Sequence, residues 1–233
     1  GSIKYPKGGY LFRPFINTLP IQAATVKDNR AVQSRILYDI GAGLCVLFSR
    51  DFIEDSAFLK KKRKIYAKQA EGLGGKIDMH ITILKEFRLG PYKFKKIRVN
   101  IFDDEFNVTS YPSMGGIIGN DLLRRFNCIL NYSKREFHLK PNSHFSESFD
   151  YAYSGLEMYM IDGDIQIAEV AKNSPAEKAG LKIGDVVIGV NNDFTQNLNR
   201  YKVAMQAPKQ KVKMVVRRNE KLMEMTVSIK SIL

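Results

Sequence analysis

An acidic residue between two apolar runs is the feature that most constrains the fold of this chain. Asp39 follows the apolar residues 36–38, and residues 44–48 form a second apolar run after the turn Ile40-Gly41-Ala42-Gly43. Short apolar runs bounded by turn residues are typical of buried strands. A carboxylate beside such strands is costly to bury unless other groups hold it. The pattern indicates either a functional carboxylate at a strand end or a loop aspartate that accepts hydrogen bonds within its own turn.

The composition is that of a folded protein with real hydrophobic cores. The chain has 233 residues, of which 44% are hydrophobic and 26% are charged, so one or two domains are expected. No apolar run approaches the length that crosses a membrane, and the first residues show no signal-peptide pattern. Gly1-Ser2 is typical of residues left after removal of an affinity tag, so we expect the natural chain to begin further upstream.

The net charge of +13 permits anionic partners, but it does not define a nucleic-acid surface. The basic residues are scattered, and the dense run Lys60-Lys61-Lys62-Arg63-Lys64 is interpreted as a solvated loop or helix face. We see no zinc-finger, helix-turn-helix or RNA-binding signature, so we expect no nucleic-acid partner. The histidines His80, His138 and His144 show no ligand spacing with cysteines or carboxylate pairs, so we expect no metal and no cofactor.

Two further motifs follow the Asp39 turn. Gly72-Leu73-Gly74-Gly75 stands before residues 77–83, in which aliphatic residues at alternate positions predict a strand with one apolar face. Glycines at a hairpin tip make it mobile, so this tip is either a flap over a bound chain or a hairpin without a role. Later, Ile117-Ile118-Gly119 leads into a short helix that Asn120 or Asp121 is expected to cap.

The order of these motifs resembles that of the retropepsin-like aspartic peptidases over residues 10–140. Asp39-Ile40-Gly41-Ala42 matches the family's Asp-Thr/Ser-Gly-Ala, and Ile117-Ile118-Gly119 looks like the segment that packs under the active-site loop. The resemblance implies a catalytic Asp39. It also implies substrate binding by Gly41, Ala42 and the flap tip, which comprises Gly72, Leu73, Gly74 and Gly75. Ile40 departs from the family, because the usual Thr or Ser hydroxyl links the two active-site loops and isoleucine has no hydroxyl.

The second half of the chain has a different texture. Residues 174–180 carry complete helix punctuation, with Ser174 as N-cap, Pro175 at the first helical position, Glu177 for a capping box and Gly180 for a left-handed end. Residues 186–190 then predict a buried strand, and later residues predict a second helix and further strands.

This order is similar to that of PDZ domains of the bacterial, protease-associated type. In such domains a glycine-rich loop before an edge strand receives the terminal carboxylate of a peptide, which adds as a strand. The resemblance implies the following peptide-binding residues: Gly155, Leu156, Glu157 and Met158 in the loop and strand, with Leu198 and Tyr201 on the second helix. The negative charge of Glu157 disfavours a carboxylate, so a PDZ-like module that binds nothing remains the alternative.

Together these patterns predict a mainly β chain with a retropepsin-like barrel lobe at 1–140, a linker at 141–152 and a PDZ domain, a small barrel with two helices, at 153–233. The whole resembles a bacterial family that joins these two parts. That resemblance implies a periplasmic or otherwise exported aspartic endopeptidase that acts on peptides or unfolded proteins. The competing hypothesis is a catalytically inactive peptide-binding or scaffold protein.

Aspartic peptidase chemistry needs two carboxylates that share a proton around one water. Asp39 is the one candidate here, so we expect either a second aspartic lobe upstream in the natural chain or a homodimer partner. Retroviral homodimers carry an acidic residue shortly after the Ala of the loop and an Arg after Ile-Ile-Gly. This chain has Gly43 and Leu44 in the first place and Asn120 in the second, which favours an asymmetric partner.

Overall fold

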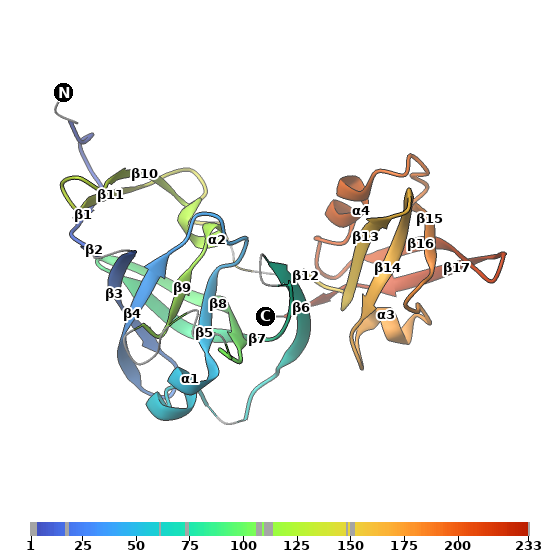
Figure 1. Cartoon of the computed structure of the whole chain (residues 1–233), viewed down its shortest axis with the longest axis horizontal. Helices are drawn as coiled ribbons and strands as arrows, with labels where there is room; N and C mark the ends of the chain where they lie inside the picture. Colours follow the sequence, from blue (N-terminus) through green and yellow to red (C-terminus); the bar gives the residue numbers. More distant parts are fainter. Residues whose placement is uncertain are drawn as a thin grey trace. The chain divides into compact units, whose positions relative to one another are not determined.

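The computed structural model describes residues 4–16, 19–60, 62–72, 75–105, 109, 114–147, 149 and 152–232. The chain divides into two compact units. The barrel unit consists of Gly1–Tyr66 and Met79–Phe149, and the C-terminal unit consists of Ala67–Asp78 and Asp150–Leu233. Both are built mainly of strands (Figure 1). None of the helices in the described ranges is long and apolar enough to cross a membrane.

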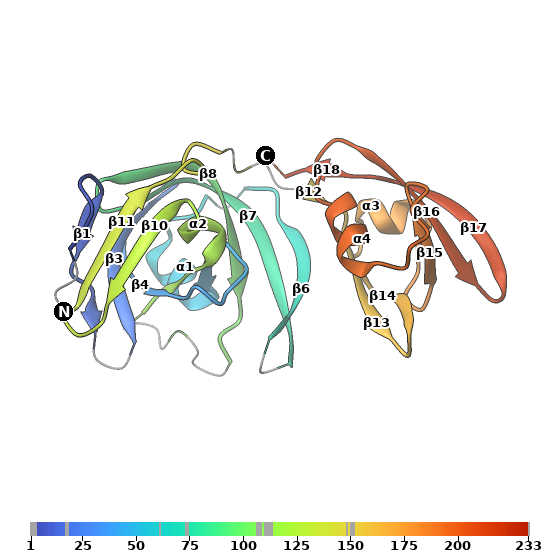
Figure 2. The ribbon, with the colours of Figure 1, turned by 90° about the horizontal axis from the view of Figure 1, so that it is seen from above.

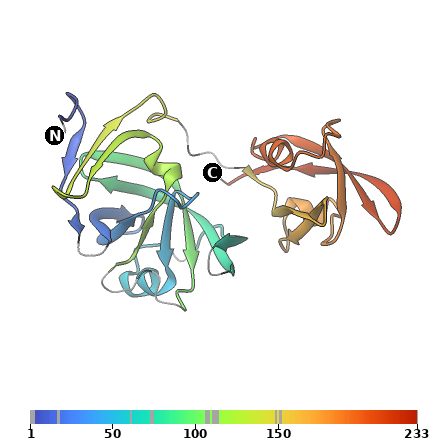
Figure 3. The ribbon, with the colours of Figure 1, turned by 45° about the horizontal axis from the view of Figure 1, so that its top comes forward.

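The strands in the first part of the chain form two sheets, and the larger one closes into a barrel. The elements of this part are β1 (Tyr10–Phe12), β2 (Phe15–Ile16), β3 (Pro20–Lys27), β4 (Ala31–Tyr38), β5 (Val46–Ser49), α1 (Arg50–Ser56), β6 (Tyr66–Gly72), β7 (Gly75–Leu89), β8 (Tyr92–Phe102), β9 (Gly116–Ile118), α2 (Asn120–Leu123), β10 (Phe126–Asn131) and β11 (Glu136–Pro141). The strand order of the larger sheet is β2-β3-β4-β9-β5-β8-β7-β6, and β7 also pairs with β3, which closes the ring. The smaller sheet has the order β1-β11-β10. α1 lies at one end of the barrel (Figure 3).

β9 is the strand that positions the Asp39 turn. It runs between β4 and β5, parallel to the first and antiparallel to the second. Tyr38 of β4 pairs with Ile118 of β9, so Asp39 and Gly119 leave the sheet next to each other. Gly116 must be small, because a Cβ there would lie 2.1 Å from the backbone carbonyl oxygen of Leu47. The two apolar runs around the turn are thus the buried end of β4 and the fully buried β5.

The two helix starts of the barrel unit differ in how they are capped. Ser49 is the N-cap of α1 and accepts a hydrogen bond from the backbone N–H of Phe52. The expected capping of α2 by Asn120 or Asp121 is wrong, because Gly119 is its N-cap and makes no side-chain hydrogen bond. The backbone N–H groups of Asn120 and Asp121 instead donate to the carbonyls of Ala42 and Leu44. The backbone carbonyls of Ala42 and Leu44 therefore accept hydrogen bonds that a capping side chain would otherwise accept.

The end of the barrel unit is held by one buried arginine. Arg125 donates hydrogen bonds to the carbonyls of His144 and Glu147, and its guanidinium lies 3.8 Å from the centroid of the Phe149 ring. Phe145 packs against the rings of Phe94 and Phe126. Phe145 and Phe149, which lie in the segment predicted to be a linker, therefore pack on the barrel unit.

The C-terminal unit is a small sheet with two short helices. Its elements are β12 (Ala152–Tyr153), β13 (Leu156–Ile161), β14 (Asp164–Val170), α3 (Pro175–Lys178), β15 (Val186–Val190), α4 (Leu198–Ala204), β16 (Lys211–Arg218), β17 (Lys221–Ser228) and β18 (Lys230–Ser231). The sheet order is β13-β14-β15-β16-β17, and β12 pairs separately with β18. The tip of the β16–β17 hairpin extends away from the rest of this unit (Figure 2).

The predicted start and end signals of α3 are confirmed. Ser174 is the N-cap and accepts from the backbone N–H of Glu177, and Pro175 begins the helix. The Glu177 carboxylate accepts from the N–H of Asn173, and Gly180 has a φ of 86° after the helix end. These signals are readable from the sequence because each is a contact between residues at most four positions apart.

A buried ion pair joins the residue before β15 to the last residue of β16 in the C-terminal unit. Asp185 is 1% exposed, and Arg218 donates to both of its carboxylate oxygens at 2.6 and 2.7 Å. The backbone N–H of Lys182 adds a third hydrogen bond at 2.9 Å. Burial pushes the pKa of Asp185 upward, but the hydrogen bonds from Arg218 and Lys182 outweigh it, so the pKa lies below its ordinary value.

Acid is therefore expected to destabilise the C-terminal unit through Asp185. Because the folded pKa is depressed, the stabilisation is complete above the unfolded pKa of about 4 and is lost as the pH falls through the folded pKa. The measurement is the melting temperature of this unit between pH 7 and pH 2. Asp185→Asn should be less stable at pH 7 and less sensitive to acid, whereas Asp164→Asn, at an exposed ion pair, should behave like the wild type. Equal acid sensitivity in the wild type and in Asp185→Asn would contradict this account.

Candidate functional site

The Asp39 carboxylate is held through one of its two oxygens. Oδ1 accepts hydrogen bonds from the backbone N–H groups of Gly41 at 2.9 Å and Ala42 at 3.2 Å. The described residues give Oδ2 no hydrogen bond, and the side chain is half-buried. One oxygen thus orients the carboxylate, and the other can meet water or a bound molecule. Gly41 and Ala42, predicted to bind substrate, contribute the N–H groups that hold Asp39 in place.

The backbone of the turn is bonded to β9 and α2 on its other side. The N–H of Asp39 donates to the carbonyl of Ile118 at 3.0 Å, and the N–H of Gly119 donates to the carbonyl of Cys45 at 3.0 Å. Gly119 has to be glycine here, because a Cβ would lie 2.2 Å from the carbonyl oxygen of Leu44. The predicted packing of Ile117-Ile118-Gly119 under the Asp39 loop therefore has a direct basis in backbone hydrogen bonds.

Ile40 projects from this turn and is 62% exposed. An isoleucine side chain has no hydrogen-bonding group, so it cannot supply the hydroxyl bridge that the resembled family places here. Gly41 and Gly43 are also exposed, whereas Ala42 is half-buried.

The glycine-rich hairpin tip lies mostly beyond what can be described. Gly72 is the last residue of β6 and Gly75 is the first residue of β7, while Leu73 and Gly74 lie outside the described residues. A role of this tip as a flap stays a prediction.

The glycine-rich loop before β13 is held against the start of α3. Gly155 has a φ of 71°, and a Cβ there would lie 2.2 Å from the Cβ of Ser174. Its carbonyl accepts from the N–H of Ala171, and the Ser154 carbonyl accepts from the N–H of Ala176. The Ser154 hydroxyl accepts from the N–H of Leu156 at 3.2 Å. The loop therefore requires glycine at position 155 and has a defined backbone shape.

The remaining predicted groove residues lie on β13 and α4, which pack against each other. Leu156 and Met158 are buried in the core of the unit, and Leu198 packs against that core from α4. Glu157 is half-buried on the opposite face of β13. Tyr201 is 1% exposed and donates its hydroxyl proton to the Asp193 carbonyl at 2.9 Å. The Tyr201 side chain thus serves the core of the domain rather than projecting outward.

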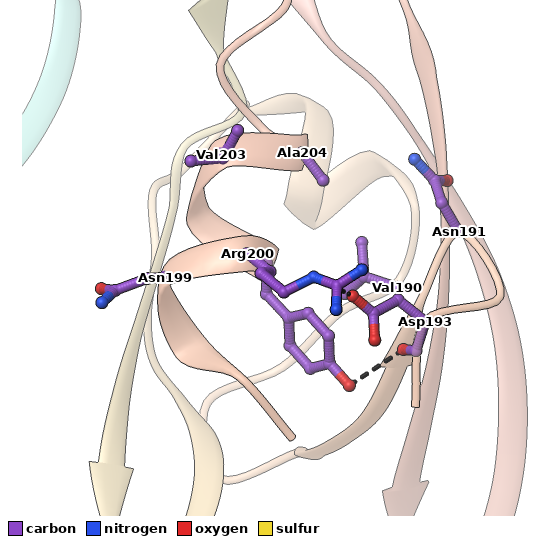
Figure 4. Close-up of a pocket in the computed structure, with 8 residues that line it drawn as sticks. Val190, Asn191, Asp193, Asn199, Arg200, Val203 and Ala204 are labelled. Carbon is purple, nitrogen blue, oxygen red and sulfur yellow. Dashed lines mark hydrogen bonds and ion pairs between the residues drawn. The ribbon is translucent and has the colours of Figure 1, made fainter. Parts of the chain in front are cut away.

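Sequence reasoning missed a pocket between α4 and the turn after β15, which Figure 4 shows. Its volume is about 410 Å³. The Nε atom of Arg200 lies 2.9 Å from Oδ2 of Asp193, and both residues line the pocket. The lining residues are Val190, Asn191, Asp193, Asn199, Arg200, Tyr201, Val203 and Ala204. The positive φ values of Asn191 and Asn192 shape the turn at its rim, and an Asn-Asn-Asp turn is the only sequence signal that could have pointed to it.

Comparison with known proteins gives two family matches, one after the other along the chain. Residues 23–122 match the aspartyl protease family, and residues 166–218 match the PDZ domain family. The first match includes β4, the Asp39 turn, β9 and the start of α2. The second includes α3, the Asp185 ion pair and α4.

A curated relative and two solved structures are similar to parts of the chain. The carboxy-terminal processing protease CtpB of Bacillus subtilis is 47% identical over 51 residues, which are 21% of this chain and 11% of that protein. The chain therefore spans about a tenth of the length of this relative. A retropepsin-like aspartic protease from Rickettsia conorii is 18% identical, with a TM-score of 0.42, over 57% of this chain and 100% of that one.

The PDZ domain of a carboxy-terminal protease from Vibrio cholerae, solved in complex with a peptide, is 21% identical with a TM-score of 0.32. That similarity covers 36% of this chain and 98% of the other. On the two family matches, the chain contains an aspartyl protease-like domain followed by a PDZ domain.

Proposed function

We propose that this chain supplies one aspartic half of an endopeptidase that hydrolyses peptides or unfolded proteins, and that its PDZ domain binds the peptide chain. The observation that carries the proposal is the state of the Asp39 carboxylate. Its Oδ1 is oriented by two backbone N–H groups, and its Oδ2 takes no hydrogen bond from the described residues. A catalytic carboxylate needs this combination of fixed position and open oxygen.

The reaction would use Asp39 as one member of a carboxylate pair that holds a single proton. The ionised carboxylate takes a proton from the bound water, whose oxygen forms a bond to the scissile carbonyl carbon. The protonated carboxyl donates its proton to the carbonyl oxygen, which gives a neutral tetrahedral intermediate. Breakdown of that intermediate passes a proton to the leaving amine and breaks the C–N bond. The proton affinities belong to the pair, so neither role is assigned permanently to Asp39.

The second carboxylate is proposed to come from a different aspartic lobe, either upstream in the natural chain or in another protein. Ile40 supports an asymmetric partner, because two symmetric copies would place two exposed isoleucines where two hydroxyls have to meet. The ion pair that the resembled retroviral homodimers form between an acid after the loop and an Arg after Ile-Ile-Gly has no counterpart here, since positions 43, 44 and 120 are Gly, Leu and Asn. A homodimer is the weaker form of the proposal.

The chain of 233 residues alone is therefore expected to be monomeric and to hydrolyse peptides very slowly or not at all. Static light scattering gives the molar mass, and a quenched-fluorescent casein with and without a statine-type inhibitor gives the activity. Adding a second aspartic lobe, as a longer natural chain or as a separate protein, should produce inhibitor-sensitive cleavage. A stable homodimer that turns over substrate and requires both Asp39 residues would refute the asymmetric form of the proposal.

A second candidate function is a non-catalytic peptide-binding protein, and the observation that favours it is again Ile40. A protein of this class would bind peptides through the PDZ domain but would not cleave them in any assembly. Comparing a peptide with a free C-terminal carboxylate against the same peptide with a C-terminal amide tests the PDZ arm by itself. Binding that requires the carboxylate, together with no cleavage in the presence of a second lobe, would favour this second function.

A further inference from the structure

The pocket beside α4 lies between that helix and a tight turn to which the helix is bonded. In this turn, Val190 and Asp193 exchange two backbone hydrogen bonds at 3.0 and 2.9 Å. Asn191 and Asn192 between them have φ values of 48° and 64°, as a two-residue hairpin turn requires. The Tyr201 hydroxyl on α4 donates to the Asp193 carbonyl. Because the turn and the helix hold each other, the pocket is formed before any ligand arrives.

Arg200 presents hydrogen-bond donors to this pocket (Figure 4). Its backbone N–H donates to the side chain of the N-cap residue Asn197, and its Nε lies 2.9 Å from Oδ2 of Asp193. Among the residues that the structure describes, the two terminal nitrogens of Arg200 find no acceptor, and the side chain is 62% exposed. A guanidinium held at Nε keeps two parallel N–H groups for a planar acceptor, and a carboxylate matches that geometry.

The charge of Asp193 is taken up within the turn and by Arg200. Its Oδ1 accepts hydrogen bonds from the backbone N–H and the hydroxyl of Thr195 at 3.0 and 2.6 Å, and its Oδ2 faces Arg200. The hydrogen bonds from Thr195 hold the pKa of Asp193 below its ordinary value, so this carboxylate is ionised at neutral pH. The pair is therefore neutral overall, and the site attracts an acid through directed hydrogen bonds rather than through net charge.

Asn191 adds a donor on the facing wall, and apolar side chains complete the pocket. The Asn191 Oδ1 accepts from the backbone N–H of Lys213 at 3.0 Å, which fixes the orientation of the amide. The amide nitrogen then lies on the side of α4 (Figure 4). Val190, Val203 and Ala204 supply apolar lining, and the volume of about 410 Å³ is in the usual range for small-molecule sites.

We propose that this pocket binds small carboxylic acids with a compact apolar body, whose carboxylate accepts hydrogen bonds from Arg200. The inference goes beyond the proposed peptidase function and does not depend on it, because the lining residues belong to β15, the turn after it and α4. Hydrogen-bonded ion pairs at exposed sites change equilibrium constants by a few-fold, so the expected preference for an acid over its amide is about fivefold. For a ligand of this size in an open pocket, the expected dissociation constant is on the order of millimolar.

The test uses phenylpropionate and phenylpropionamide, which have the same shape and differ in charge. Each is titrated into the whole, isotope-labelled chain, and binding is followed by the NMR shifts of backbone amides. We expect the amides of Asn191 and Ala204 to shift with both probes, with about fivefold tighter binding of the acid. The amides of Leu156 and Met158, remote from the lining residues in sequence, should stay unchanged. Arg200→Met, which keeps an apolar stem, should lose the preference for the acid.

A matched control removes the same charge from another exposed ion pair of this unit. Arg217 pairs with Asp164 at 3.3 Å and does not line the pocket, so Arg217→Met should keep the fivefold preference. Equal binding of acid and amide by the wild type would overturn the proposed ligand class, and so would a preference that survives in Arg200→Met. Absence of shifts at Asn191 and Ala204 with about 10 mM of either probe would overturn the site itself. None of these outcomes bears on peptide hydrolysis at Asp39.

Discussion

Replacing Asp39 by asparagine is expected to lower peptide hydrolysis by at least ~1000-fold, in whichever assembly cleaves peptides, without unfolding the barrel unit. The asparagine amide cannot take a proton from water at neutral pH, so the general base is lost. Its Oδ1 can still accept hydrogen bonds from Gly41 and Ala42, which hold the aspartate in the structure. The measurements are kcat with a fluorogenic peptide and the melting temperature of the same preparation.

A matched control replaces a carboxylate that has no part in the site. Asp55 is exposed on α1, and Asp55→Asn removes the same charge from the same unit. It should leave both kcat and the melting temperature unchanged. Full activity in Asp39→Asn would show that another carboxylate performs the chemistry, and the assignment of Asp39 would then fail.

Gly119→Ala is expected to destabilise the barrel unit by about 3 kcal/mol and to abolish activity together with stability. A Cβ at this position would lie 2.2 Å from the carbonyl oxygen of Leu44 and 2.7 Å from that of Ala42. Both are backbone atoms in or directly after the Asp39 turn, so no side-chain rotation can relieve the clash. The turn must move away from β9 and α2, and the hydrogen bonds from Gly119 and Asn120 to the turn would break.

The control for this prediction is another glycine of the same turn. A Cβ at Gly43 would meet nothing within 4 Å, and Gly43 does not have a positive φ, so Gly43→Ala should be neutral or slightly stabilising. Scanning calorimetry resolves the barrel transition, and the transition of the PDZ domain provides an internal reference that should not change. A melting temperature for Gly119→Ala equal to that of Gly43→Ala would contradict the proposed close contact.

Local signals in the sequence predicted a large part of this protein. The motifs of the first half resemble those of retropepsin-like peptidases, and that resemblance implied a barrel lobe. The capping residues around Ser174 predicted α3. The cap of α1 by Ser49 was equally predictable. For both helices the interacting residues are neighbours in the chain, so local hydrogen-bonding geometry determines the outcome.

The run of basic residues at 60–64 shows where such reading failed. It was interpreted as a solvated face, but Arg63 is largely buried and forms an ion pair with the buried Asp28. Asp28 also accepts hydrogen bonds from the backbone N–H groups of Lys60 and Lys85. Nothing in the run itself distinguishes Arg63 from the lysines beside it. Its partner is thirty-five positions away, so only the folded chain identifies it.

The strand at 77–83 shows the same limit for a period-two pattern. Alternation placed Thr82 on the polar face, yet it is buried and donates its hydroxyl proton to the carbonyl of Lys64 at 2.8 Å. Periodicity predicts two faces but not which segment covers the second one.

The sequence by itself determined the two domain types of this protein, its locally capped helices and the candidate carboxylate. The tertiary structure decided how that carboxylate is held. β9 is remote from Asp39 in sequence but runs beside β4, so that Ile118 accepts a hydrogen bond from the N–H of Asp39. Gly116 and Gly119 let this segment lie close to the backbone of residues 42–47. Contacts of this kind depend on which remote segments become neighbours and on how closely they pack. Neither produces a periodic pattern in the sequence.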